Sequence, residues 1–438
     1  MKAKPMLVGV GLLVVLGIGA DFLLNRADPR EGSAPPLAGA PAAAPAIARG
    51  EYLARAADCI ACHTVPASGR DFAGGVAFVL PFGTIYSSNI TRDPDTGIGM
   101  WSDEDFVRAL RTGVRKDGQH LYPAFPYTSY TALSRADVLA IKAYLFSLPP
   151  IKQPARPNQL GFPFNQRWAM SFWNAAFFKD QRFQSDDSQP PGWNSGAYLA
   201  TALGHCAECH TPRNFGFGLR RGSELAGEEL QGWKAYNITS DRQSGIGAWT
   251  DEQIAAYLKT GHAAGRASAS GPMAEVIADS LQYLSVEDIA SLTAYLRSVP
   301  ARTGRFDIAA ARSTALAADA SAALPAGAAL RGTGDPGLEL FAGACSGCHG
   351  WNGIGRQSAY ADLRGLRGLG DPGATNITQV ILHGSSYRIG AQDVFMPSFA
   401  RGYSDAEIAA LDNFVLGYFG GQPGALTPEQ IARSREGR

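Results

Sequence analysis

Three short motifs bring cysteine and histidine together in one order. All six cysteines lie in Cys-x-x-Cys-His sequences, CIACH at 59–63, CAECH at 206–210 and CSGCH at 345–349. In this pattern two thioether bonds attach a haem to the chain, and the adjacent histidine is placed to ligate the iron from one side. The motifs predict three covalent c-type haems, attached through Cys59 and Cys62, Cys206 and Cys209, and Cys345 and Cys348, with His63, His210 and His349 as iron ligands.

Cysteine pairs have other uses, which must be weighed against haem attachment. A zinc site, a redox dithiol and a disulfide framework also place cysteines at short spacing. None of them explains three identical triplets that each end in histidine. Covalent haem attachment is periplasmic chemistry in bacteria. The motifs therefore also predict that the body of the chain lies on the periplasmic side of the bacterial inner membrane.

A haem that only transfers electrons usually takes a second axial ligand. A methionine thioether is the soft donor that raises its potential. Six methionines are available. Met396 stands in the sequence VFMPSF after the third motif, and Met273 stands in SGPM after the second. We predict that both ligate iron, because a rigid loop containing proline can hold a sulfur atom in a fixed direction.

The first motif lacks a matching methionine. GIGMW at 97–101 and GIGAW at 245–249 align the first two segments at an offset of 148 residues, and subtracting 148 from Met273 gives Phe125 in HLYPAFPYTSY at 120–130. A phenyl ring cannot ligate iron. We expect the sixth position of the first haem to be open or weakly ligated, with Met100 or His120 as the alternative ligands.

The repeat extends beyond the haem motifs. Asn-Ile-Thr begins at Asn89, Asn237 and Asn376, which lie 30, 31 and 31 residues after the first cysteine of each motif. A tripeptide tied to each motif predicts a turn that forms hydrogen bonds near the haem edge. The first two repeats are also expected to share a capped helix that begins at WSDE (101–104) and WTDE (249–252), and the third repeat is expected to lack this helix.

Each repeat is expected to close with a capped helix. A Ser-x-x-acid box opens an apolar-periodic run late in every repeat, at Ser134, Ser285 and Ser404. An aromatic residue follows each serine ten positions later. We expect this residue to pack against the helix leading into the haem motif (Tyr144, Tyr295 and Phe414).

The N-terminus reads MKAKPMLVGVGLLVVLGIGADFLLN, with an uncharged apolar run from Met6 to Ala20. This run is long for a signal-peptide core and short for a full membrane span. Because the residues at 18–20 make a poor cleavage site, a retained anchor is expected over a cleaved signal. Either segment exports the residues that follow it.

These patterns predict a mainly α fold of three tandem haem domains behind the N-terminal segment. The connector at 150–193 is crowded with aromatic residues, which are expected either to pack on a partner subunit or between domains, or to form ordinary inter-domain core. The predicted divisions are anchor or signal 1–25, a flexible or extended Ala/Pro-rich linker 26–48, domain 1 49–149, the connector 150–193, domain 2 194–300, an Ala-rich linker 301–333, domain 3 334–421 and a tail 422–438.

The chain resembles the tri-haem cytochrome c subunits of bacterial membrane-bound periplasmic dehydrogenases, which oxidise alcohols, gluconate, sugars or aldehydes. The resemblance covers most of residues 49–421 and rests on GEYLARAADCIACHT, NITRDPDTGIG, WSDEDFVRALRTGVRKDGQHLYPAFPY, GAYLATALGHCAECHTPRN and VFMPSF. It implies three tandem class I cytochrome c domains. Members of this family carry methionine where Phe125 stands, which places the usual ligation of the first haem in doubt.

The resemblance also implies a function. A separate catalytic subunit that uses pyrroloquinoline quinone, flavin or molybdopterin oxidises the substrate, a small accessory subunit can accompany it, and the cytochrome passes the electrons to ubiquinone in the membrane. The chain's zero net charge offers no footprint for nucleic acid. The alternatives are a cytochrome whose first haem is open and reactive, and a donor subunit of a terminal oxidase.

Overall fold

The computed structural model describes residues 31–32, 34–306 and 334–436. The expected anchor or signal at 1–25 lies outside these residues, as does most of the expected linker at 301–333. Within the described ranges, no helix combines the length and apolar character needed to span a membrane. The chain forms two compact units. The first contains residues up to 208 with 213–220 and 283–295, and the second contains 209–212, 221–282 and 296 onward.

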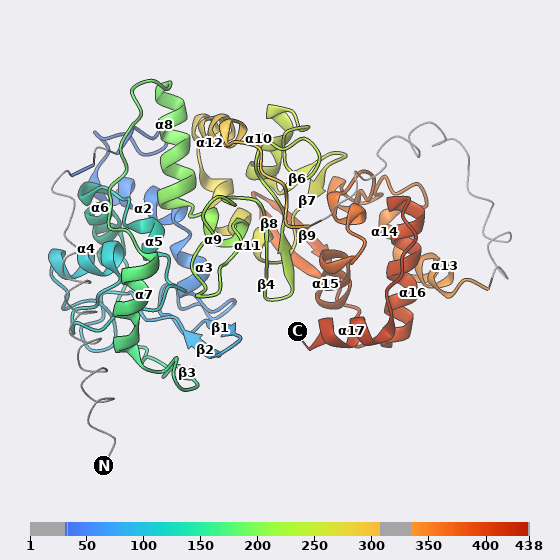
Figure 1. Cartoon of the computed structure of the whole chain (residues 1–438), viewed down its shortest axis with the longest axis horizontal. Coiled ribbons are helices and arrows are strands. Elements are labelled where there is room, and N and C mark those ends of the chain that lie inside the picture. Colours follow the sequence, from blue (N-terminus) through green and yellow to red (C-terminus); the bar gives the residue numbers. More distant parts are fainter. Residues whose placement is uncertain (1–30, 33, 307–333, 437–438) are drawn as a thin grey trace, which may run out of the picture. The chain divides into compact units, whose positions relative to one another are not determined.

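The first unit is mainly helical and carries one small antiparallel sheet of order β1–β2–β3. Ala77 pairs with Tyr86, and Gly83 pairs with Leu160. Helices α2 and α6 pack against each other (Figure 1). The elements are α2 (Ala46–Ala56), α3 (Cys59–His63), β1 (Ala77–Leu80), β2 (Gly83–Tyr86), α4 (Asp103–Thr112), α5 (Tyr127–Tyr130), α6 (Arg135–Ser147), β3 (Gln159–Leu160), α7 (Met170–Phe177) and α8 (Pro191–Tyr198).

The second unit combines helices with three two-stranded hairpins. Its C-terminal part has its own core, in which Leu369, Leu382 and Ile408 are fully buried. The elements are β4 (Glu228–Leu230), β5 (Trp233–Ala235), α10 (Asp251–Thr260), β6 (His262–Ala263), β7 (Ala267–Ser268), α11 (Gly271–Asp279), α13 (Pro336–Leu340), α14 (Ser346–His349), α15 (Thr375–His383), β8 (Ser385–Ile389), β9 (Gln392–Met396), α16 (Asp405–Val415) and α17 (Pro428–Arg435). Two further helices, α9 (Ala207–His210) and α12 (Val286–Ser298), contain residues of both units.

In every repeat, the helix that leads into a haem motif crosses the closing helix at a glycine. A Cβ atom added at this glycine would collide with a backbone carbonyl oxygen and would crowd the Cβ atom of an aromatic residue. The predicted packing of these aromatic residues is thereby confirmed. The three sets are Gly50 with Ala140 and Tyr144, Gly196 with Ser291 and Tyr295, and Gly337 with Ala410 and Phe414.

The predicted serine boxes are also confirmed as helix starts. Each serine Oγ accepts the backbone N–H of the acidic residue three positions later, at 3.1 to 3.3 Å. Such a bond satisfies one of the four N–H groups that a helix start leaves without a partner. The boxes therefore fix where α6, α12 and α16 begin.

The third repeat contains a helix that its sequence was expected to lack. Helix α15 ends at Gly384 (φ 74°), just as α4 ends at Gly113 (φ 66°) and α10 at Gly261 (φ 78°). No side chain caps the start of α15. Its helix is stabilised instead by burial of residues such as Ile381 and Leu382. The absence of a local capping signal did not mean the absence of the helix, because tertiary packing provides most helix stability in proteins.

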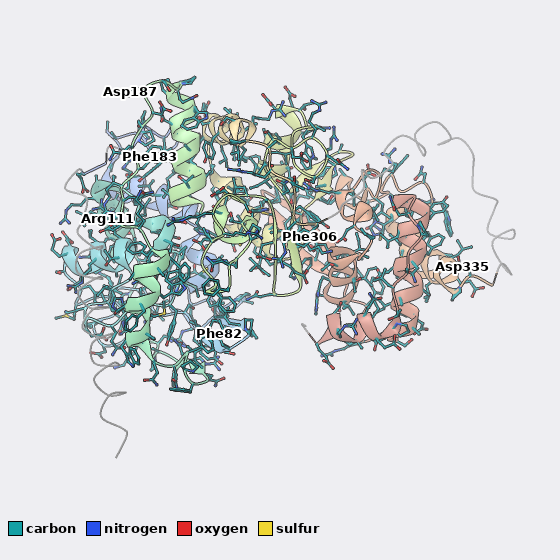
Figure 2. The ribbon with its side chains drawn as sticks, viewed as in Figure 1. Phe82, Arg111, Phe183, Asp187, Phe306 and Asp335 are labelled. Atoms are coloured by element: carbon teal, nitrogen blue, oxygen red, sulfur yellow. The ribbon has the colours of Figure 1, made fainter. Side chains whose placement is uncertain are left out.

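The linker predicted at 26–48 is packed where the structure describes it, so the expectation of a flexible or extended spacer was wrong there. Leu37 and Ala40 are fully buried, and the backbone N–H groups of Ala38 and Gly39 each donate to the Asp288 carboxylate at 2.9 Å. Glu31 accepts a 2.6 Å hydrogen bond from Arg111 (labelled in Figure 2). Small residues let this segment lie close to the body, where buried side chains satisfy its backbone groups.

The aromatic connector divides into buried and exposed parts. Phe178 packs edge-on against Tyr127, with 5.3 Å between ring centres, and Phe183 (Figure 2) packs against Tyr198, with 5.2 Å between ring centres. Part of the connector is therefore ordinary core of the first unit. In contrast, Phe162 is 82% exposed and Trp168 is 59% exposed. The expected core packing is therefore confirmed for part of the connector only.

A buried carboxyl group in domain 3 predicts a pH effect on stability. Asp412 is fully buried in α16, and Thr378 donates to it at 2.6 Å. Burial raises its pKa to about 7. Because the pKa is raised on folding, stability is greatest below the ordinary aspartate pKa and falls as the pH rises to about 7. We expect Asp412→Asn to be stabilising at pH 8 by on the order of a few kcal/mol.

The measurement is thermal unfolding of the full chain at pH 5 and at pH 8. The wild type should lose more stability between these pH values than the Asp412→Asn variant. The matched control is Asp393→Asn, because Asp393 is exposed on the same unit. Equal pH dependence in wild type and Asp412→Asn would contradict the assignment.

Candidate haem-binding sites

The first motif forms helix α3, in which neither cysteine is in a disulfide and the histidine is held by the backbone. The Nδ1–H of His63 donates to the carbonyl oxygen of Ser88 at 2.7 Å. Burial lowers the pKa of His63, which favours the neutral ring that a metal requires. With Nδ1 engaged, Nε2 keeps its lone pair for a metal, which is the usual arrangement for a ligating histidine. The site offers one oriented nitrogen donor beside two thiols.

The second and third motifs repeat this arrangement. The Nδ1–H of His210 donates to the carbonyl oxygen of Tyr236 at 2.6 Å, and that of His349 donates to the carbonyl oxygen of Ala361 at 2.7 Å. Burial lowers the pKa of both histidines. The sequence predicted the three histidines but not the three carbonyl groups that orient them.

The cysteines fit thioether attachment better than the rival uses. None of the six is in a disulfide. Burial raises the pKa of the Cys59 thiol to about 12 and that of Cys345 to about 11, whereas a reactive dithiol needs a lowered pKa. In the described part of the chain, no group of three or more His, Cys, Asp or Glu side chains could hold a metal ion by itself.

Two of the three Asn-Ile-Thr segments form the predicted turn. Asn89 follows Ser88, accepts the N–H of Thr91 at 2.9 Å and donates to the Ile151 carbonyl oxygen at 2.8 Å. Asn237 follows Tyr236 and forms the equivalent bonds. Each turn therefore fixes the carbonyl group that orients its histidine.

The third Asn-Ile-Thr was wrongly expected to form the same turn. Asn376 lies in the first turn of α15 and exchanges two hydrogen bonds with the backbone of Lys234 in β5, at 2.8 and 3.0 Å. The carbonyl that holds His349 comes from Ala361, 15 residues before Asn376. A fixed offset in sequence therefore did not give the same local structure in the third repeat.

The predicted distal residues take different places. Met273 is the third residue of α11, and Met396 ends β9, where it packs against the buried cluster that contains Cys345. Phe125 is half-buried two residues before α5. Of its alternatives, Met100 is 65% exposed, and His120 directs both ring nitrogens toward α7.

Comparison with known proteins places the chain in a family. A family model described as cytochrome c matches residues 47–149 and 335–418. The fructose dehydrogenase cytochrome subunit of Gluconobacter japonicus is 39% identical over 407 residues, covering 90% of this chain and 83% of that protein. The chain belongs to the cytochrome c subunits of dehydrogenases. Two further relatives are the gluconate 2-dehydrogenase cytochrome c subunit of Pantoea cypripedii, at 35% identity (89% of this chain and 89% of that protein), and the alcohol dehydrogenase (quinone) cytochrome c subunit of Gluconobacter oxydans, at 34% (89% and 82%).

Membership of this cytochrome c family implies covalently bound haem c, and a buried arginine shows a second fit to that group. Arg367 donates to the Asn237 carbonyl oxygen at 3.0 Å, and its guanidinium lies 4.9 Å from the centre of the Tyr236 ring. Its Nη2 and the Tyr236 hydroxyl are both buried without a protein partner. A buried cation is costly unless an anion pairs with it. A haem propionate beside His210 would supply that anion, because the Tyr236 carbonyl orients His210.

This fit predicts a change in potential. Burial lowers the pKa of Arg367 to about 10, so the side chain remains a cation at neutral pH. Arg367→Leu should lower the reduction potential of the second haem by on the order of tens of mV, because a nearby cation favours the reduced form. A redox titration of the holoprotein measures this reduction potential. The matched control is Arg388→Leu, since Arg388 is exposed on the same unit, and equal potentials in the two variants would oppose the pairing.

A contact that the sequence did not predict links the segments before the first two motifs. The Tyr130 hydroxyl donates to the carbonyl oxygen of Ala57 at 2.7 Å, two residues before Cys59. The Tyr130 ring lies edge-on to His205, 5.7 Å between ring centres, and His205 directly precedes Cys206. In the cytochrome, this short path of bonds and contacts joins the backbone beside two haem attachment points.

Proposed function

We propose that the cytochrome relays electrons from the catalytic subunit of a periplasmic dehydrogenase to ubiquinone in the bacterial inner membrane. The observation that carries this proposal is the threefold site: two cysteines of one Cys-x-x-Cys-His motif beside a histidine whose Nδ1–H is held by a backbone carbonyl. Three bound haems would supply three one-electron redox centres on one chain. The contact of Tyr130 with His205 supports transfer between the first two attachment segments.

The protein's own residues set how each centre behaves. The carbonyl groups of Ser88, Tyr236 and Ala361 each hold one histidine ring in a fixed orientation. The ring should therefore move little when the iron changes its oxidation state. Met273 and Met396 are proposed as distal ligands of the second and third haems. Their thioether sulfurs favour reduced iron and raise the potential. No side chain is proposed to carry out substrate oxidation, which we assign to a separate subunit.

The class of substrate and partner is proposed from the relatives. Their names specify fructose, gluconate and alcohol dehydrogenases, and one of them names a quinone. We propose alcohol or aldehyde oxidation on a catalytic subunit of the pyrroloquinoline quinone, flavin or molybdopterin type, with a small accessory subunit as a third component. The N-terminal segment at 1–25 is proposed to hold the complex at the membrane.

Purification of the complex from its native membrane tests the proposal. A dehydrogenase subunit should co-purify, its alcohol or aldehyde substrate should reduce the haems, and a soluble ubiquinone analogue should reoxidise them. A pyridine haemochrome assay should give three haems per chain. Co-purification with a haem–copper oxidase in place of a dehydrogenase would refute the proposed role, and fewer than three haems would refute the threefold site.

A further inference from the structure

The structure aligns the three segments that contain Phe125, Met273 and Met396 more firmly than the sequence can. Helices α4, α10 and α15 each end at a glycine of positive φ, namely Gly113, Gly261 and Gly384. By subtraction, the residue 12 positions after each glycine is Phe125, Met273 or Met396. Counted from these three glycines, Phe125 takes the position that a methionine holds in the other two segments.

Backbone hydrogen bonds support this register in the first two loops. The N–H of Leu121 donates to the Gly113 carbonyl oxygen at 2.7 Å, and the N–H of Ala269 donates to that of Gly261 at 2.7 Å. Both pairs are related by 148 residues, the same offset that separates Phe125 from Met273. The two loops thus follow the same path to within four residues of the position in question.

The loop around Phe125 is held in place by its own contacts. The N–H of Phe125 donates to the Tyr122 carbonyl oxygen at 3.0 Å, and its carbonyl oxygen accepts from the N–H of Tyr127 at 2.8 Å. The Phe125 ring lies edge-on to Tyr130, with 5.4 Å between ring centres. Tyr127 is fully buried and donates to Asn174 at 2.6 Å. Phe125 is therefore a packed residue of an ordered loop.

His120 is engaged elsewhere. Its Nε2 lies 3.1 Å from the Ser171 hydroxyl and its Nδ1 lies 3.3 Å from the Asn174 amide nitrogen, both on α7. Its carbonyl oxygen accepts from Arg167 at 2.8 Å. To ligate iron, His120 would have to give up its contacts with α7.

Met100 lies at the wrong end of α4. It precedes Ser102, which caps the start of the helix, whereas the distal loop leaves from Gly113 at the other end. A helix of 10 residues rises about 15 Å along its axis. Met100 is also 65% exposed, so its thioether sulfur is not held in a packed position.

We propose that the haem attached at Cys59 and Cys62 has no protein ligand opposite His63, and that this face binds a small neutral ligand, for which carbon monoxide is the probe. A neutral ligand is favoured because the ring of Phe125 is apolar, the hydroxyl of Tyr130 is already bonded to Ala57, and His120 is directed to α7. Binding forms one coordinate bond and transfers no electron, so it needs no co-reactant. The proposal rests on the haem attachment of the proposed function but not on the dehydrogenase partner.

The test is a carbon monoxide difference spectrum of the dithionite-reduced full-length holoprotein. We expect a Soret change that corresponds to one haem of the three. Phe125→Met should reduce this change to background, because the thioether fills the position. Phe125→Leu is the matched control, since it alters the same residue without adding a ligand, and it should retain the change. In the ferric wild type, electron paramagnetic resonance should show one haem with a high-spin signal, which Phe125→Met should convert to low spin.

The possible failures are distinguishable. Absence of a spectral change in the wild type would overturn the proposal. So would a change that arises only in His120→Asn or Met100→Leu, because it would identify that residue as the sixth ligand. In either case a haemochrome count of three with normal quinone reduction would leave the proposed electron relay intact.

Discussion

Replacing Met396 by leucine is expected to lower the reduction potential of one haem by on the order of 0.1 V or more, a part of the roughly 0.8 V range that axial ligands set. Leucine nearly preserves the volume of methionine, so the packing against the domain 3 core should change little. The sulfur is lost, and with it the soft donor that favours reduced iron. A spectroelectrochemical titration of the holoprotein should resolve the shift in one of three waves.

The chain provides a matched control for this substitution. Met170 is buried in α7, where it fills the core of the first unit. Met170→Leu removes a sulfur atom from the same chain and should leave all potentials unchanged. If Met396→Leu gives the same three potentials as Met170→Leu, Met396 is not an iron ligand.

The residues of the haem motifs could be predicted because their signal is local. Two cysteines and a histidine within five positions carry the chemistry whatever the rest of the chain does, and the structure gives all three histidines the same role for Nδ1. The serine boxes were predictable for the same reason, since a capping bond joins residues three positions apart.

Residues whose role depends on distant contacts could not be predicted in this way. Arg367 meets the Asn237 carbonyl across 130 residues, and no motif marks it. The third Asn-Ile-Thr shows the opposite error. Its spacing matched that of the first two, which predicted a turn, but Asn376 lies in a helix. Spacing predicted structure only where local hydrogen bonds could enforce it.

The helix-ending glycines combine both kinds of information. A single glycine in a sequence of 51 glycines has little meaning. Its place becomes clear once the structure shows that Gly384, like Gly113 and Gly261, directly follows a helix and has a positive φ. This register, which the third repeat's sequence did not reveal, is what makes the difference between Phe125 and the two methionines significant.

Gly337→Ala is expected to destabilise domain 3 by about 2–3 kcal/mol, the cost of overpacking a closely fitted contact. The added Cβ would collide with the Ala410 carbonyl oxygen and crowd the Cβ atom of Phe414, at 2.7 Å. The carbonyl belongs to the backbone of α16, so the collision can be relieved only by moving α13 away from α16. Because α13 leads into the third haem motif, the loss should be accompanied by faster hydrogen exchange in residues 336–349.

Gly343→Ala is the control that separates steric crowding from the general effect of replacing glycine. Gly343 lies in the same segment, in the π-helical turn at Phe341–Cys345, and an added Cβ there meets no atom within 4 Å. Alanine should be neutral at that position, or stabilising by up to about 1 kcal/mol, since it restricts the unfolded chain. Chemical unfolding of the full chain should therefore show lowered stability for Gly337→Ala and unchanged or raised stability for Gly343→Ala, and hydrogen exchange in residues 336–349 should be faster only in Gly337→Ala. If Gly337→Ala is tolerated as well as Gly343→Ala, close approach of α13 and α16 is not required, and the same reasoning would then fail for Gly50 and Gly196.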